Sequence, residues 1–245
     1  MNQTKQTATA DPAGPAGSGS PIAAAVIFAL YLLLGPAILL LAAGTLAWSA
    51  AWAYIAIILL GALGSRWAAW RQDPSVLRER ANFTRAEQAV PGDRMLVLVS
   101  GVVGPLVAMV VAGLDHRFGW SNPPSVTLQS AAIILIALMA GVSTWAMATN
   151  PFFSAVARLQ TDRGQTVVQS GPYRWVRHPS YASALLYSLA LPLALGSAWI
   201  LLPTAFIVAA IIVRTHREDH MLLAGLPGYD AYARRTRFRL FPGVW

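Results

Sequence analysis

The sequence predicts an all-α polytopic membrane protein with about six hydrophobic helices, and three observations support that fold class. Of the 245 residues, 56% are hydrophobic and only 11% are charged, whereas a soluble domain carries roughly 25% charged residues. The mean hydropathy is +0.52. The apolar residues fall in long runs that polar stretches separate. Cysteine is absent, which excludes disulfides and thiolate metal sites.

The first two thirds of the chain are expected to form a tail and four membrane spans. Residues 1–21 are rich in Ala, Gly, Pro and Ser, a composition typical of a disordered tail. Residues 22–149 then form an N-terminal four-span region, in which Gly35-Pro36 predicts a kink. The expected spans are Ile22–Ala47, Ala50–Trp67, Met95–Leu114 and Val126–Thr149.

The first polar stretch covers residues 68–93. Asp73-Pro74 offers an N-cap and a first-turn proline, which predicts a short helix from Pro74 to about Ala81. This helix would lie on lipid headgroups or, alternatively, contribute to a functional site.

Residues 180–213 form an apolar run that is too long for one span and too short for two. Pro192 and Gly196-Ser197 mark a break in it. Two helices of about 15 residues would each cover roughly 22 Å, against a hydrocarbon core near 30 Å. We therefore expect a tight helical hairpin, and whether it crosses the bilayer completely stays open.

The placement of basic residues predicts the orientation. With six passes, Lys5 and every arginine except Arg117 lie on one side, and the positive-inside rule makes that side cytoplasmic. Both termini would face the cytoplasm, as expected for a multi-pass protein of a bacterial inner membrane. Because membrane topology alone accounts for the net charge of +8, nucleic acid is not an expected partner. The oligomeric state stays open.

Residues 171–181, Gly-Pro-Tyr-Arg-Trp-Val-Arg-His-Pro-Ser-Tyr, are the first candidate for chemistry, and we call them the motif loop. Gly171-Pro172 indicates a turn, and Pro179 predicts the start of a helix with His178 at its mouth. A charged turn that opens into a membrane helix is costly unless it lines a polar cavity.

A second charged segment follows the hairpin. Arg214 and Glu218 are four residues apart and share a helical face. They would either surround a polar pocket together with Arg177 and His178, or simply anchor a helix at the interface. His216 and His220 have metal-ligand spacing but no third ligand nearby, so no metal is expected. We expect His116 to be a solvated loop residue.

The C-terminal residues 226–245 alternate arginines with aromatic residues. Such a segment is typical of a surface that binds headgroups, or it could close the pocket.

These residues resemble a known family. Gly171-Pro172-Tyr173, Val176–Tyr181, Arg214 with Glu218-Asp219, Gly228-Tyr229 and the closing Arg237–Gly243 are similar to the signature of the isoprenylcysteine carboxyl methyltransferase family, which is related to phospholipid N-methyltransferases. The resemblance covers about Asn150–Trp245, so residues 150–245 would form the catalytic region. Asp219 is a departure, because relatives commonly carry Glu there.

The resemblance implies the cofactor S-adenosylmethionine and a set of site residues. The catalytic residues would be Arg177 and Arg214, which would face an acceptor carboxylate. The expected cofactor-binding residues are Gln160, Val168, Gln169, Tyr173, His178, Tyr181 and Glu218.

The chemistry is compatible with a lipid-like carboxylate acceptor of isoprenoid or prenylcysteine type. Such a carboxylate is ionised at neutral pH and needs a planar guanidinium rather than a base. A lipid headgroup amine or a thiol stays open as the acceptor. An NADPH-dependent sterol or enone reductase is the alternative enzyme, although those enzymes usually continue a similar turn with Gly-Glu rather than Ala182-Ser183. A non-catalytic membrane adaptor, with the same charges as an ion network, is the third possibility.

Overall fold

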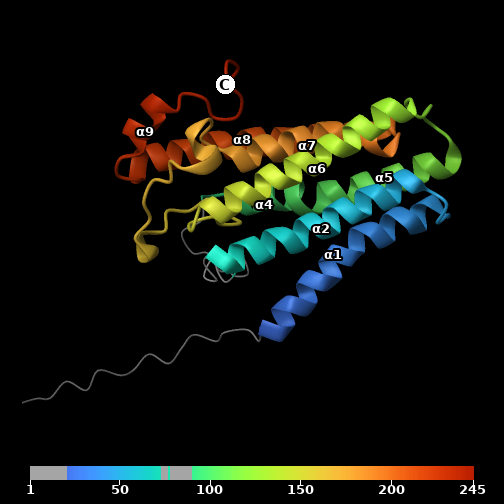
Figure 1. Ribbon diagram of the computed structural model, residues 1–245, viewed down its shortest axis with the longest axis horizontal. Helices are drawn as coiled ribbons and strands as arrows, with labels where there is room; N and C mark the ends of the chain where they lie inside the picture. The colour runs from blue at the N-terminus through green and yellow to red at the C-terminus, as the bar shows by residue number, and fades with distance from the viewer. Residues whose placement is uncertain (1–20, 73–76, 78–89) are drawn as a thin grey trace, which may run out of the picture.

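The computed structural model describes residues 21–72, 77 and 90–245, and within them the regular elements are all helices. The predicted all-α class is therefore confirmed. Most of the helices run side by side, with their connections gathered at two ends (Figure 1). The predicted tail and the predicted helix Pro74–Ala81 lie outside the described residues, apart from Pro21 and Leu77.

The N-terminal helices follow the predicted spans with adjusted boundaries. The fourth span is confirmed without change as α6, Val126–Thr149. The first was predicted to reach Ala47, and this limit was wrong because Gly44, at a φ of 66°, turns the chain after Ala43. The helices of this region are α1 (Pro21–Ala43), α2 (Ser49–Gln72), α4 (Asp93–Leu98), the π-helical turn η2 (Val99–Val103), α5 (Gly104–Phe118) and α6.

Four helices in the described part of the chain are long and apolar enough to cross a membrane: Ser49–Arg71, Asp93–Phe118, Val126–Thr149 and Ala198–Gly225. Two shorter apolar helices accompany them, Phe28–Ala43 and Pro179–Leu195. Together they correspond to the six expected hydrophobic helices of an integral membrane protein.

The hairpin consists of α7 (Pro179–Leu195), the turn η5 (Ala198–Ile200) and α8 (Leu201–Gly225). Gly196, at a φ of 68°, makes the break, whereas Pro192 lies inside α7. The expected length of about 15 residues was wrong for α8, which has 25. This helix continues past Val213 because several of its charged side chains find partners inside the protein, as described below.

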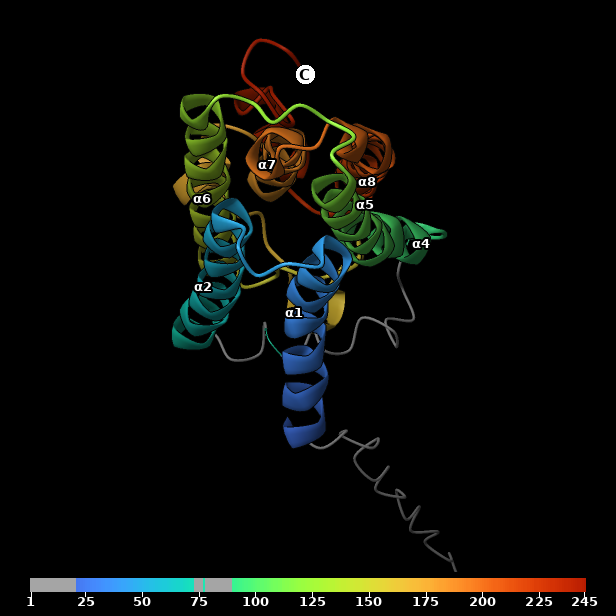
Figure 2. The same ribbon diagram turned by 90° about the vertical axis from the view of Figure 1, so that its right-hand side faces the viewer.

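Small residues allow the membrane helices to approach closely. An added Cβ at Gly113 of α5 would lie 2.5 Å from the Ala42 Cβ of α1, and one at Gly104 would lie 2.6 Å from Ile207 of α8. Close backbone approach through small residues is typical of helix packing in membranes. Viewed along the bundle, α7 lies between α6 and α8, and α1 and α2 lie on the other side (Figure 2).

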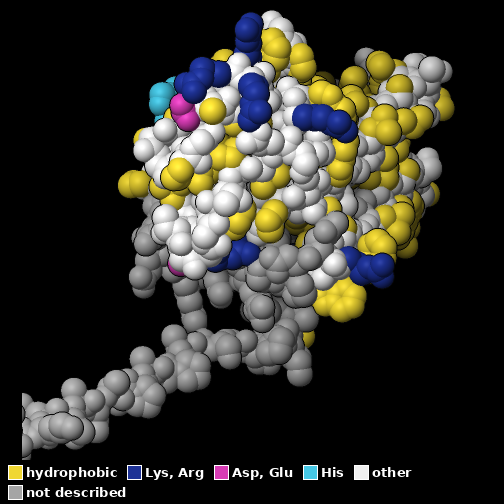
Figure 3. Space-filling model, turned by 60° about the vertical axis from the view of Figure 1, so that its left-hand side comes forward, with side chains coloured by type: hydrophobic (Ala, Val, Ile, Leu, Met, Phe, Trp, Pro, Cys, Tyr) yellow, Lys and Arg dark blue, Asp and Glu magenta, His cyan; other side chains and the backbone are white. Residues whose placement is uncertain are grey.

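The two ends of the bundle differ in charge. The motif loop, the end of α8, the short helix α9 (Tyr229–Arg235) and the C-terminal tail lie together at one end, which we call the motif end (Figure 1). Arginine side chains gather on this part of the surface, with histidine and acidic side chains among them (Figure 3). Arg117 lies at the opposite end, against Gly44.

At the opposite end, a buried acid, Asp115, links two connections between helices. Its carboxylate accepts hydrogen bonds from the Ser121 amide (2.7 Å), the Ser121 hydroxyl (2.7 Å) and the Ser197 hydroxyl (2.5 Å). These bonds hold the α5–α6 connection against the α7–α8 turn. His116 is exposed, as expected, but it is not a loop residue. It lies in the last turn of α5 and stacks on Trp48, with ring centroids 4.0 Å apart.

Candidate active site

The motif loop folds as a tight turn against the end of α6. Gly171 has a φ of 56°, and an added Cβ would lie 2.7 Å from the Thr149 hydroxyl, so glycine is required there. The Asn150 amide donates to the Tyr173 hydroxyl (3.2 Å). Burial raises the pKa of Tyr173, so its neutral hydroxyl can donate to the Ala146 carbonyl (3.4 Å). As predicted, α7 starts at Pro179 with His178 as its N-cap.

The C-terminal tail pairs with the motif loop. The backbone amides of Arg177 and His178 donate to the carbonyls of Phe238 (3.0 Å) and Arg239 (2.9 Å). The tail thus holds two residues of the motif loop, each from a position 61 residues later in the chain. The tail therefore packs against the motif loop, and its closing of a pocket stays a prediction.

Asp219 is the centre of a buried ion cluster. Its side chain is fully buried and contacts four side chains from the motif loop, α9 and the tail. They are Arg177 (Nε to Oδ1 and Nη2 to Oδ2, both 2.8 Å), His178 (Nε2 to Oδ1, 3.2 Å), Tyr229 (hydroxyl to Oδ1, 2.9 Å) and Arg239 (Nε to Oδ2, 2.7 Å). Burial, followed by the charge of Asp219, raises the pKa of Tyr229. Its hydroxyl is therefore neutral and donates to the carboxylate.

Arg177 is fully engaged inside the protein. Besides the two contacts with Asp219, its Nη1 donates to the carbonyls of Thr236 (3.0 Å) and Arg237 (2.9 Å). Each of its three guanidinium nitrogens thus has an internal acceptor. These bonds hold the tail against α8 and engage every nitrogen of the Arg177 guanidinium. The role that the resemblance implies for Arg177, facing an acceptor carboxylate, stays a prediction.

Tyr181 and Glu218 form a second pair at the motif end. The Tyr181 hydroxyl donates to Glu218 Oε2 at 2.5 Å. The ring of Tyr181 stacks on His178, with centroids 5.7 Å apart and planes 15° from parallel. Among the described residues, Oε1 of Glu218 makes no hydrogen bond, so one carboxylate oxygen is open to a ligand.

Arg214 is paired with Asp93 at the start of α4. Its Nε and Nη2 donate to Oδ1 (2.9 Å) and Oδ2 (3.2 Å) of that acid, and Nη2 also donates to the Ala155 carbonyl (2.9 Å). The guanidinium carbon lies 5.2 Å from the centroid of the Tyr181 ring. Nη1 has no acceptor among the described residues, whereas every buried side-chain nitrogen and oxygen there has a hydrogen-bond partner. This nitrogen therefore reaches accessible surface and can bind a ligand.

The segment that precedes the motif loop lies at the same end. Gln160 is buried, its amide donates to the Phe152 carbonyl (2.6 Å), and its Oε1 accepts from Arg163. Its side chain thus shapes the loop. Gln169 is exposed and accepts a hydrogen bond from Arg235, and Val168 is half-buried. Among the described residues, no hydrogen bond joins Gln160, Gln169 or Val168 to Glu218.

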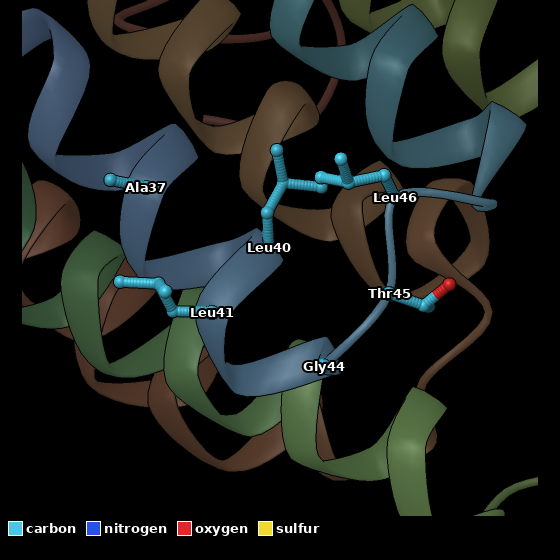
Figure 4. Close-up of a pocket in the computed structure, with 6 residues that line it drawn as sticks. All are labelled: Ala37, Leu40, Leu41, Gly44, Thr45 and Leu46. Atoms are coloured by element: carbon cyan, nitrogen blue, oxygen red, sulfur yellow. The ribbon is translucent and has the colours of Figure 1, made fainter.

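Two other features of the described residues do not join this site. His216 and His220 are exposed on α8 with ring centroids 4.4 Å apart, and no third metal-ligating side chain accompanies them in the described part of the chain. An apolar pocket lies at the end of α1, at the opposite end of the bundle (Figure 4). Its lining residues are Ala37, Leu40, Leu41, Gly44, Thr45 and Leu46.

Sequence reasoning missed Asp93 and assigned little to Asp219. Both are buried acids that pair with an arginine predicted to be catalytic. A signal for Asp93 existed, because it is an acid at the boundary between a polar stretch and a membrane span, where an ionised side chain needs a partner. The sequence does not show which arginine that partner is.

The open groups at the motif end fit a positively charged nucleoside such as S-adenosylmethionine. Glu218 presents a carboxylate oxygen that has no partner within the described residues. The rings of His178 and Tyr181 stack on each other, and the Tyr181 hydroxyl holds the other oxygen of this carboxylate in place. The donor set is thus compatible with the implied cofactor.

The fold and the site together define an integral membrane protein with a polar site at one end of a helical bundle. Residues 131–224 match the model of the isoprenylcysteine carboxyl methyltransferase (ICMT) family. The match confirms the predicted family resemblance. It begins within α6 and ends near the end of α8, and it therefore leaves out α9 and the tail. It indicates a membrane methyltransferase.

Proposed function

We propose that this protein is an S-adenosylmethionine-dependent carboxyl methyltransferase that acts on a lipid-like acceptor of isoprenoid or prenylcysteine type. One observation carries the proposal. At the motif end, Tyr181 contacts both an arginine with an open nitrogen, Arg214, and a carboxylate with an open oxygen, Glu218. S-adenosylmethionine supplies an activated methyl group when it is bound.

The cofactor-binding role falls to Glu218, His178 and Tyr181. Glu218 would accept hydrogen bonds from the cofactor through Oε1, since Oε2 is occupied by Tyr181. His178 would keep the Tyr181 ring in place through stacking, and Asp219 in turn holds His178. The backbone of residues 167–169 and the loop around Gln160 would complete the site.

The acceptor role falls to Arg214 alone. Of the guanidinium nitrogens of Arg177 and Arg214, only Nη1 of Arg214 has no acceptor among the described residues. A carboxylate acceptor is ionised at neutral pH, so no residue needs to remove a proton from it. A positioned guanidinium would align the acceptor oxygen, and alignment supplies much of the acceleration in reactions of this kind.

The distribution of charge supports a cytoplasmic motif end. A water-soluble cofactor would enter from the cytoplasm and the lipid-like acceptor from the bilayer. A lipid headgroup amine or a thiol as acceptor would require a group that removes a proton. Among the open groups near Arg214, Glu218 is already assigned to the cofactor.

Titration of the purified protein with S-adenosylmethionine and with NADPH tests the proposal. We expect binding of S-adenosylmethionine, and methyl transfer to an S-farnesylcysteine whose amino group is blocked. Binding of NADPH alone would favour a reductase, and binding of neither would favour an adaptor.

The same titration tests the role of Glu218. Glu218→Ala removes a charge-assisted hydrogen bond worth on the order of 1.5–3 kcal/mol, so affinity for S-adenosylmethionine should fall about ten- to a hundredfold. His220→Ala, which changes an exposed residue on the same helix, is the matched control and should bind normally. Unchanged affinity in a folded Glu218→Ala variant would show that Glu218 only anchors the helix.

A further inference from the structure

Asp93 is a buried acid to which the proposed chemistry assigns no direct task. It lies at the start of α4, outside the residues that match the family model, and its side chain is fully buried. Its two oxygens receive Nε and Nη2 of Arg214. Oδ2 also accepts the backbone amide of Ala157 (2.8 Å). Asp93 thus joins α4, α8 and the loop after α6.

Arg214 has a second carboxylate within reach on its own helix. Glu218 lies four residues further along α8, the spacing at which an arginine and a glutamate pair on a helix surface. In the structure Arg214 instead pairs with Asp93, while Glu218 receives the Tyr181 hydroxyl. Tyr181 contacts both residues, since its hydroxyl donates to Glu218 and its ring lies under the Arg214 guanidinium.

We propose that Asp93 is a positioning residue that captures the Arg214 guanidinium and so prevents it from pairing with Glu218. This inference rests on the proposed function, in which Glu218 binds the cofactor and Arg214 the acceptor. If the two residues paired with each other, each would occupy the group that the other needs for its ligand. Asp93 keeps them apart and leaves both open.

The geometry and burial of the Arg214–Asp93 pair explain why Arg214 does not pair with Glu218. The Arg214–Asp93 pair is two-pronged and buried, and charge-assisted pairs of this geometry are among the strong hydrogen bonds of proteins. Replacing Asp93 with a neutral residue would leave the buried Arg214 guanidinium without its counter-charge, which is strongly unfavourable. The freed side chain would turn to the nearest carboxylate on its helix face, Glu218.

The test measures the dissociation constant of S-adenosylmethionine by calorimetry on the detergent-purified full chain. Asp93→Asn should weaken binding about tenfold, because a paired Glu218 loses a charged contact with the cofactor. The double variant Asp93→Asn/Arg214→Gln removes the arginine that would occupy Glu218. Its dissociation constant should therefore return to within about twofold of the parent value. A role of Asp93 that acted only through its bond to the Ala157 amide would not produce this rescue.

Asp115→Asn is the matched control. Asp115 is an equally buried acid at the opposite end, so its change should lower the midpoint of thermal unfolding without altering the dissociation constant. Parent-like binding by a folded Asp93→Asn variant, or a double variant that binds as weakly as the single one, would overturn the proposal.

Should Asp93→Asn fail to fold, the double variant decides alone, since it contains no unpaired buried charge. Parent-like binding then supports the proposal, and weak binding overturns it. A parent protein that binds no S-adenosylmethionine would instead overturn the proposed function.

Discussion

At the scale of single residues, each of the two arginines predicted to be catalytic is held by its own buried acid. Arg177 pairs with Asp219 and Arg214 with Asp93. The pairs differ in what they leave free. The tail carbonyls take up the remaining nitrogen of Arg177, whereas one nitrogen of Arg214 has no acceptor in the described part of the chain. Two chemically identical side chains are therefore suited to different tasks, one to holding the fold and one to binding a ligand.

This difference predicts the effect of a conservative change at Arg214. Arg214→Lys keeps the positive charge near Asp93 but loses the planar group that holds Asp93 and the acceptor together. Methyl transfer to blocked S-farnesylcysteine should fall at least tenfold, while the affinity for S-adenosylmethionine should remain near the parent value. Turnover and calorimetric titration measure the two quantities separately.

Arg217→Lys provides the control on the same helix. Arg217 is exposed and makes one contact with the Pro91 carbonyl, and exposed contacts of charged side chains contribute little. Its turnover should therefore remain normal. Near-normal turnover of Arg214→Lys as well would show that Arg214 does not hold the acceptor.

At the scale of elements, α8 and the tail build the site together. The face of α8 that carries Arg214 and Asp219 is buried, and the same helix exposes His216, Arg217 and His220. The tail places the buried side chain of Leu240 against Ile207 and Ile211 of α8. From there its backbone accepts the amides of the motif loop. The tail is thus a packed part of the site, although it also carries exposed arginines.

Leu240 offers a test of this packing. Leu240→Ala should destabilise the protein by about 2–5 kcal/mol, since deleting buried leucine atoms leaves a cavity. The midpoint of unfolding in detergent and the affinity for S-adenosylmethionine should both fall, because the tail holds His178 in position. Val244→Ala, at a residue that is 79% exposed, should change neither. A parent-like midpoint for Leu240→Ala would mean that the tail detaches without consequence.

At the scale of the whole molecule, the charged and apolar parts are separated along the bundle. The site, α9 and the tail lie at the motif end, and Asp115 closes the opposite end through Ser121 and Ser197. The aromatic residues Phe118, Trp120 and Trp199 are exposed at the opposite end, as expected at a membrane interface.

This arrangement predicts the orientation in the membrane. A reporter that is active only in an exported compartment should be silent when it is fused after Trp245, because the positive-inside rule makes the motif end cytoplasmic. The same reporter inserted between Phe118 and Pro124 should be active. The opposite pattern would contradict the orientation, and activity at both positions would contradict the three passes, α6, α7 and α8, that separate them.

The sequence alone determined the helices, because each depends on information within a few residues. Long apolar runs predicted the membrane helices, and Pro179 after His178 predicted the start of α7. The predicted length failed for α8, which runs on through the charged residues after Val213. The sequence placed Arg214 and Glu218 on a helical face, but it did not show that Asp93, 121 positions before Arg214, neutralises that arginine.

The family signature likewise predicted the site residues, but only the tertiary structure decided their partners. Arg214 and Glu218 share a helical face by spacing, yet Arg214 binds Asp93 and leaves Glu218 to Tyr181. Arg177 and Asp219 are 42 positions apart and meet only because the α7–α8 hairpin brings its ends together. Helical periodicity is encoded locally, whereas the choice between two carboxylates depends on which one the packed bundle places within about 3 Å and removes from water.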